Sequence, residues 1–96
     1  MCAILGLVTD KDNASLTLYN ALTVLQHRGQ EAWGIAVPNK TPLKKLGLVS
    51  SSAPEFKKIS DEYSSFAAIG HVRYSTIGKS NLHNAQPLKV KDLCIA

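Results

Sequence analysis

The chain has 96 residues, of which 45% are hydrophobic and 19% are charged, and its formal net charge is +4 at pH 7. This is the composition of an ordinary globular domain with one modest core, and the length excludes two domains. No apolar run approaches the roughly 18 residues of a membrane-spanning helix and no secretory signal opens the chain, so we expect a cytoplasmic location.

The first elements in chain order are a strand and a helix. The apolar run CAILGLV, residues 2–8, is typical of a buried strand. Asp12 or Asn13 then offers a side-chain oxygen that can cap a helix start. The segment ASLTLYNALTVLQHRG, residues 14–29, predicts that helix because its leucines recur at spacings of four and three. The apolar stripe consists of Leu18, Leu22 and Leu25.

The end of this helix is marked by the letters HRG. His27 and Arg28 place positive charge where the helix dipole favours it, and Gly29 is expected to end the helix in the left-handed conformation.

The run AWGIAVP, residues 32–38, predicts a second strand, and residues 39–49 predict a hairpin turn that leads into a third.

The second half of the chain predicts a short helix and two more strands. Residues 50–65 are polar and suit the helix, whereas residues 66–76 begin as a buried strand and become polar at His71. A last strand is expected within residues 88–96. Because most strand segments are continuous apolar runs, we expect sheets covered on both faces.

Cysteines, histidines and lysines limit the possible ligands. Cys2 and Cys94 are the two cysteines, and without a secretory signal a structural disulfide is not expected. The three histidines stand at no metal-ligand spacing with either cysteine, so we predict no metal site. The lysines are scattered and no aromatic residues interleave with them, so a nucleic-acid surface is not expected.

Cys2 allows two interpretations. Free cysteine packs well as a small hydrophobic residue in a first strand. Removal of Met1 would instead give Cys2 a thiol and a free α-amine on one residue. An α-amine titrates near neutral pH and can take the thiol proton, which activates the sulfur as a nucleophile without a separate histidine.

Three other motifs favour the nucleophile. The segments LQHRGQEAWGIAV, GHVRYST and NAQP occur in that order in the chain. Together they resemble the class II glutamine amidotransferases, whose nucleophile is an N-terminal cysteine. Within that class, TLYNALTVLQHRGQEAWGIAV and IGHVRYSTIG are most similar to the amidophosphoribosyltransferase family. Three motifs in the right order are far more specific than any one of them.

The resemblance implies a fold and a function. The fold would be α+β: residues 1–96 would form part of a four-layer α/β/β/α N-terminal-nucleophile hydrolase fold with antiparallel sheets. The chain would be the N-terminal portion of a glutaminase domain, without a phosphoribosyltransferase domain. Its substrate would be glutamine, and the ammonia released would serve purine nucleotide biosynthesis. No cofactor is implied for this chain.

Roles for individual residues also come from the resemblance. Cys2 would attack the side-chain amide of glutamine, and Arg28 and Gly29 would lie beside it and shape its pocket. Arg73 would pair with the α-carboxylate of the substrate, as a planar guanidinium fork is suited to do. The remaining two residues, which would contact the same carboxylate through hydroxyl or backbone groups, are Ser75 and Thr76.

Each assignment has an alternative from the residues themselves. Arg28 is also a natural residue for a helix end, and Arg73 is also compatible with a surface position on a strand. His71 invites the role of general base, but the α-amine already fills it, so a structural histidine is the better interpretation.

The sequence departs from the family pattern at Ala3, where glycine usually follows the nucleophile. The Asn-Gly pair of the oxyanion hole and the acidic residue that binds the substrate amine are absent from the 96 residues. We therefore expect the missing segments to come from a complementary chain or a homo-oligomer. The alternative function is a non-catalytic interaction or oligomerisation module derived from half of a glutaminase domain.

Overall fold

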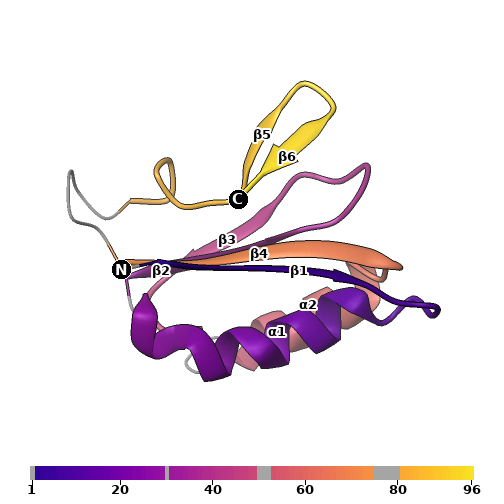
Figure 1. The fold of residues 1–96 in the computed structure, drawn as a ribbon, viewed down its shortest axis with the longest axis horizontal. Coiled ribbons are helices and arrows are strands. Elements are labelled where there is room, and N and C mark those ends of the chain that lie inside the picture. Colours follow the sequence, from indigo (N-terminus) through magenta and orange to yellow (C-terminus); the bar gives the residue numbers. More distant parts are fainter. Residues whose placement is uncertain (1, 30, 50–52, 75–80) are drawn as a thin grey trace.

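A computed structural model describes residues 2–29, 31–49, 53–74 and 81–96 (Figure 1). An antiparallel four-stranded sheet has the order β1-β4-β2-β3, and a separate hairpin pairs β5 with β6. The strands are β1 (Ala3–Val8), β2 (Ala32–Ala36), β3 (Leu43–Leu46), β4 (Ala67–Arg73), β5 (Leu88–Val90) and β6 (Leu93–Ile95). The helices are α1 (Ala14–Leu25), the short 3-10 helix η1 (Gln26–Arg28) and α2 (Ala53–Glu62). The α+β class with antiparallel sheets is confirmed.

Helices α1 and α2 lie together on one face of the four-stranded sheet, and the β5–β6 hairpin lies on the other side (Figure 1). We call the side turned away from the helices the helix-free face. Its side chains follow from strand alternation and register, because residues paired across strands point to the same side. Two of its rows across β1, β4 and β2 are Ile4, His71 and Gly34, and Gly6, Ile69 and Ala36.

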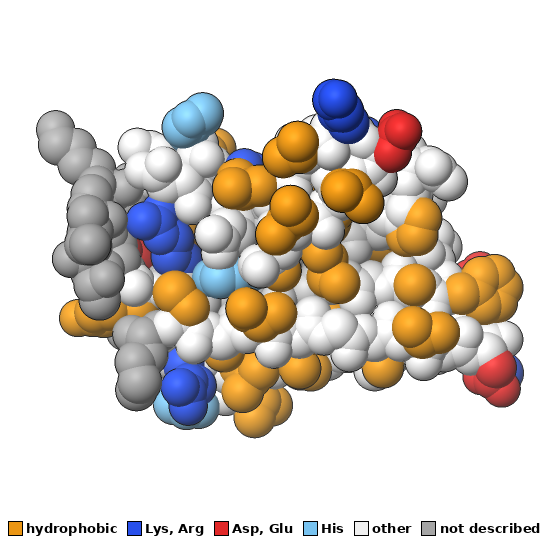
Figure 2. All heavy atoms as spheres, turned by 45° about the horizontal axis from the view of Figure 1, so that its top comes forward, with side chains coloured by type: hydrophobic (Ala, Val, Ile, Leu, Met, Phe, Trp, Pro, Cys, Tyr) orange, Lys and Arg blue, Asp and Glu red, His pale blue; other side chains and the backbone are white. Residues whose placement is uncertain are grey.

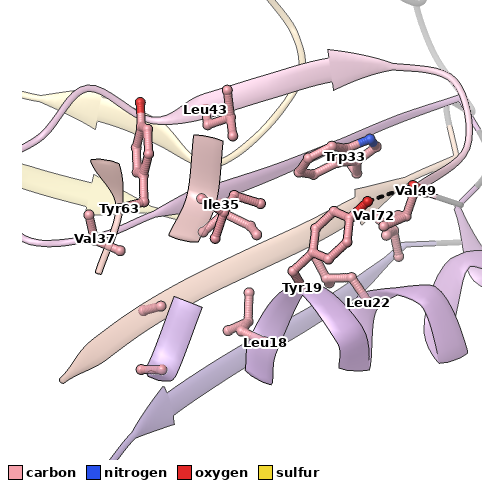
Figure 3. Packing of buried hydrophobic residues seen from close by; sticks show 13 residues of the cluster. Leu18, Tyr19, Leu22, Trp33, Ile35, Val37, Leu43, Val49, Tyr63 and Val72 are labelled. Atoms are coloured by element: carbon pink, nitrogen blue, oxygen red, sulfur yellow. Dashed lines mark hydrogen bonds between the residues drawn. The ribbon is translucent and has the colours of Figure 1, made fainter. Parts of the chain in front are cut away.

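The core lies between the sheet and α1. Leu18 and Leu22 are completely buried against Trp33 and Ile35 of β2, as the leucine stripe predicts (Figure 3). Helix α1 can approach β4 closely because Gly70 has no side chain, and a Cβ there would collide with Leu18.

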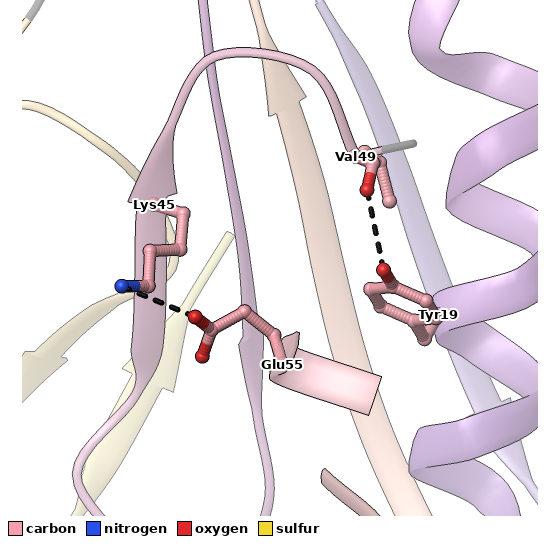
Figure 4. Close-up of polar contacts among 4 residues, drawn as sticks. All are labelled: Tyr19, Lys45, Val49 and Glu55. Atoms are coloured by element: carbon pink, nitrogen blue, oxygen red, sulfur yellow. Dashed lines mark hydrogen bonds and ion pairs between the residues drawn. The ribbon is translucent and has the colours of Figure 1, made fainter. Parts of the chain in front are cut away.

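Polar contacts attach the flanking segments to this core. The Tyr19 hydroxyl donates to the Val49 carbonyl over 3.2 Å, and the Lys45 ammonium lies 3.2 Å from the Glu55 carboxylate, which ties β3 to α2 (Figure 4). The buried Ser15 hydroxyl donates to the Tyr63 carbonyl over 2.6 Å. The last two contacts hold α2 and the residue that follows it against β3 and α1.

Three local expectations are wrong. Gly29 does not end the helix in the left-handed conformation, since its φ is −159° and its backbone is extended. The segment 88–96 is not one strand: it folds back at Lys91, whose φ is 55°, and forms the β5–β6 hairpin. Asn13 occupies the N-cap position of α1, but its side chain makes no capping hydrogen bond.

The expectation that sheets are covered on both faces holds only in part. Burial alternates along β1, and on the helix-free face Ile4 is 60% exposed and Val8 is 81% exposed. Figure 2, which brings the hairpin side forward, shows hydrophobic side chains spread over this surface. Among the described residues, no helix has the length and apolar character needed to cross a membrane.

Candidate functional site

The start of β1 and the end of β4 meet at one end of the sheet. Ala3 pairs with Val72, so the preceding residue, Cys2, stands beside Arg73 and Tyr74. The Cys2 thiol is exposed, and its sulfur lies 3.8 Å from the Tyr74 carbonyl oxygen, to which it donates. We call this end of the sheet the Cys2 end.

Strand alternation determines which way the groups at the Cys2 end point. Ala3 packs against the core beneath the sheet, and Cys2 therefore points to the helix-free face, as Ile4 does. Arg73 stands two residues beyond His71 on β4 and shares that face. The methyl group of Ala3 is thus directed into the core and away from the face that carries the thiol.

Arg73 is held by backbone contacts on the β2 side of β4. It pairs with Ala32 of β2, and its carbonyl accepts the backbone N–H of Glu31 over 3.1 Å. Its side chain is half-buried. A guanidinium on a fixed strand end is a suitable group for binding a carboxylate.

Gly29 brings the segment after α1 against the same strand end. A Cβ on Gly29 would lie 2.5 Å from the Val72 carbonyl carbon and 2.6 Å from the Arg73 nitrogen. Glycine is required here by this close backbone approach. Arg28, the last residue of η1, precedes it and is exposed.

The structure therefore brings Cys2, Arg28, Gly29 and Arg73 to one end of the sheet. Ser75 and Thr76 lie outside the described residues.

A buried histidine lies one row further along the helix-free face. His71 is only 4% exposed, and neither ring nitrogen has a hydrogen-bond partner among the described residues. Burial lowers the pKa of the imidazole below its ordinary value of 6.5, and the positive charge of Arg73 lowers it further. His71 is therefore a neutral polar group inside the protein at neutral pH.

A groove of about 720 Å³ opens on the helix-free face, toward the other end of the sheet. The sheet contributes Gly6, Ala36 and Ile69 to its lining, and the hairpin contributes Lys89 and Cys94. Of the candidate site residues that the structure describes, none lines this groove. This groove was not predicted from the sequence, because it depends on how the hairpin folds back over the sheet.

In the described part of the chain, no three His, Cys, Asp or Glu side chains gather where they could hold a metal ion. Cys2 and Cys94 are both free thiols.

Comparison with known proteins gives clear relatives, although no protein-family model matches the chain. The "Amidophosphoribosyltransferase 2, chloroplastic" of Arabidopsis thaliana is 44% identical over 90 residues, which are 90% of this chain and 16% of the relative. The amidophosphoribosyltransferase of Pasteurella multocida is 42% identical over 94% of this chain and 18% of its own length. That of Archaeoglobus fulgidus is 42% identical over 95% of this chain and 20% of its own length. The chain thus spans a fifth or less of these relatives.

Proposed function

We propose that this chain, which by sequence is a segment of an amidophosphoribosyltransferase, carries the nucleophile of a glutamine-hydrolysing site. In this proposal Cys2 releases ammonia from glutamine through a thioester, and the ammonia serves purine nucleotide biosynthesis. Arg73 binds the α-carboxylate of glutamine, and Arg28 and Gly29 form the wall beside the thiol. Ser75 and Thr76 contribute further contacts to the carboxylate.

The proposed reaction has two covalent steps. After removal of Met1, the α-amine of Cys2 takes the thiol proton, and the sulfur adds to the amide carbon of glutamine. The resulting oxyanion collapses, the carbon–nitrogen bond breaks, and ammonia leaves with the proton that the amine returns. Water then attacks the thioester, so that glutamate leaves and the thiol is restored.

One observation carries the proposal: Cys2, directly before β1, stands beside Arg73 at the end of β4, because Ala3 pairs with Val72. Paired strands lie only about 5 Å apart. A glutamine whose carboxylate binds the guanidinium of Arg73 can therefore present its side-chain amide to the thiol on the neighbouring strand. The close contact of Gly29 with Val72 and Arg73 gives this end of the sheet a rigid wall.

The complete glutamine-hydrolysing site also needs oxyanion donors, which are not among the described residues. Removal of a single oxyanion donor typically slows such chemistry by about 10²–10³-fold. We propose that further segments supply these donors, from a complementary chain or a second copy of this one. In the same arrangement a second antiparallel sheet, begun by the β5–β6 hairpin, covers the helix-free face and completes a four-layer α/β/β/α fold.

The proposal is tested by the mass of the chain and by covalent labelling. Intact-mass measurement should find a chain that begins at Cys2, because a retained Met1 blocks the amine and contradicts the mechanism. A diazoketone analogue of glutamine should then label one thiol.

The matched variants show which thiol reacts and whether Arg73 helps to bind the analogue. Labelling should disappear in Cys2→Ala and persist in Cys94→Ala, which removes the other free thiol. It should slow by at least about tenfold in Arg73→Ala, because a charged hydrogen bond to the analogue is lost. Equal labelling of Cys2→Ala and the unmodified chain would overturn the proposal.

A second candidate function is an interaction module, which the exposed apolar surface favours. On the hairpin, Leu93 is 67% exposed and Ile95 is 54% exposed, in addition to the exposed residues of β1. Sedimentation analysis should show self-association if this surface pairs copies of the chain. Association together with an unreactive Cys2 would favour this second candidate over the first.

A further inference from the structure

His71 is a buried titratable group that the proposed reaction does not use. Its ring stands on the helix-free face, two residues before Arg73 on β4, so the two Cα atoms are roughly 7 Å apart. The imidazole is almost completely enclosed, and no described residue bonds either ring nitrogen. A buried polar group without a partner is uncommon and calls for a physical explanation.

The groups that face His71 come from three directions. Across β1 its direct neighbour is Ile4, and across β2 it is Gly34, so neither strand presents a charge in that row. The backbone of Gln86 and the ring of Pro87 fill the space above Gly34.

Four other charged or titratable groups belong to these neighbouring elements. Lys44 is paired with Gly34, and its ammonium donates to the Ala85 carbonyl over 3.0 Å. Lys89 and Asp92 line the groove further along the face, and the Cys2 thiol lies at the Cys2 end. Among all these groups, Arg73 is the charge that acts on His71.

We infer that binding of a carboxylate to Arg73 is coupled to uptake of a proton by His71. This inference rests on the proposed function, since it takes the α-carboxylate of glutamine as the ligand. His71 acts through Arg73 and does not touch the substrate, so it is a positioning residue.

The coupling follows from the charges. Without a ligand, protonated His71 would place a second positive charge beside a guanidinium in a poorly hydrated setting, so the neutral imidazole is favoured. A carboxylate bound to Arg73 compensates that guanidinium charge, which makes protonation of His71 easier. By linkage, protonation of His71 then strengthens carboxylate binding by the same factor.

The first experiment needs no ligand and no activity. The chain is labelled with ¹⁵N-histidine, the His71 ring signals are assigned with His71→Gln, and the pH titration is followed by NMR. In Arg73→Gln the pKa of His71 should rise, whereas Arg73→Lys, which keeps the charge, should leave it near its value in the unmodified chain. Lys45→Gln is the matched control, because it removes a cation that pairs with α2 on the helix side. An unchanged His71 titration in Arg73→Gln would overturn the coupling.

The second experiment adds L-glutamine to the Cys2→Ala chain, which cannot hydrolyse it. Saturation should raise the pKa of His71, and calorimetry in buffers of different ionisation enthalpy should detect proton uptake. Glutamine affinity should rise as the pH falls, by at most about tenfold per pH unit for one linked proton. In Cys2→Ala combined with His71→Gln this pH dependence should flatten.

The possible failures are distinguishable. Glutamine binding that leaves the His71 titration unchanged would overturn the inference and leave the proposed function standing. If glutamine shifts no resonance at all, the ligand-linked half of the inference is overturned, and the labelling of Cys2 by the glutamine analogue decides the proposed function separately. The effect of Arg73→Gln on His71 would still establish the charge coupling in that case.

Discussion

The backbones of Gly29 and Val72 are in direct contact: a Cβ added to Gly29 would lie 2.5 Å from the Val72 carbonyl carbon. The Val72 carbonyl carbon and the Arg73 nitrogen, which this Cβ would meet, are main-chain atoms on a central strand and cannot rotate away. Gly29→Ala should therefore lower the free energy of unfolding by about 1–3 kcal/mol, as overpacking does. Urea denaturation measures this loss.

Gly6→Ala is the control for that substitution, because a Cβ at Gly6 would meet no atom within 4 Å. Its effect should be neutral or slightly stabilising, since alanine loses less backbone entropy than glycine in a strand. Equal destabilisation by the two variants would mean that the contact between Gly29 and Val72 is not what requires glycine.

Gly34→Ala should act locally on the segment above it. The new methyl group would collide with the Gln86 carbonyl oxygen and with Pro87, which lie over β2. Displacement of that segment should also weaken the bond between Lys44 and the Ala85 carbonyl. Hydrogen exchange should accelerate within residues 81–95 more than in α1, whereas uniform acceleration would contradict a local effect.

Ser15→Ala should cost about 1–3 kcal/mol of stability, because it leaves the buried Tyr63 carbonyl without its donor. Thr23→Ala provides the comparison. Its hydroxyl also donates to a helix carbonyl, that of Asn20, but the bond is exposed and water can replace it. Thermal unfolding should show a clear loss for the first variant and little change for the second.

The pKa of His71 predicts how stability depends on pH. Burial and the charge of Arg73 hold this pKa below 6.5 in the folded chain. As the pH falls through 6.5, the unfolded chain binds a proton that the folded chain does not, so the free energy of unfolding decreases. The contribution of His71 to stability is complete above 6.5, the pKa of the imidazole in the unfolded chain, and is lost as the pH falls toward the lower pKa of the folded chain.

The slope of that decrease is at most about 1.4 kcal/mol per pH unit. His71→Gln should remove this contribution, so denaturation curves between pH 7.5 and pH 5 should lose less stability in the variant than in the unmodified chain. Identical slopes in the two chains would show that His71 is protonated equally in the folded and unfolded states.

The sequence predicted most elements of the fold for identifiable reasons. The leucines of α1 reveal a helix because they repeat with its period, and apolar runs locate β1, β2 and β4. The β5–β6 hairpin was missed because its turn, Lys91 and Asp92, lacks the Asn-Gly or Asp-Gly pair that marks a two-residue hairpin, although Lys91 has a φ of 55°. Local sequence shows an apolar strand but does not show where it reverses.

At the site too, the residue types could be predicted from the sequence, but the contacts between distant segments could not. Gly29 was expected to end the helix in the left-handed conformation, but the structure requires glycine there for another reason, its close approach to β4 more than forty residues away. The resemblance supplied Cys2 and Arg73 as partners, whereas their proximity depends on strand register. The enclosure of His71 depends on neighbouring strands and could not be predicted from GHVRYST.

Because Ala3 pairs with Val72, the position of Cys2 in the chain determines which side of the sheet its thiol faces and which residue it stands beside. Side chains alternate along β1, so a single-residue deletion at Ala3, with the register of the remaining strand kept, would turn the thiol toward α1 and into the core. Removal of two residues would return the sulfur to the helix-free face, but opposite His71 and away from Arg73. The proposed site therefore depends on the exact number of residues between Cys2 and the paired part of β1, and cleavage of Met1 leaves that number unchanged.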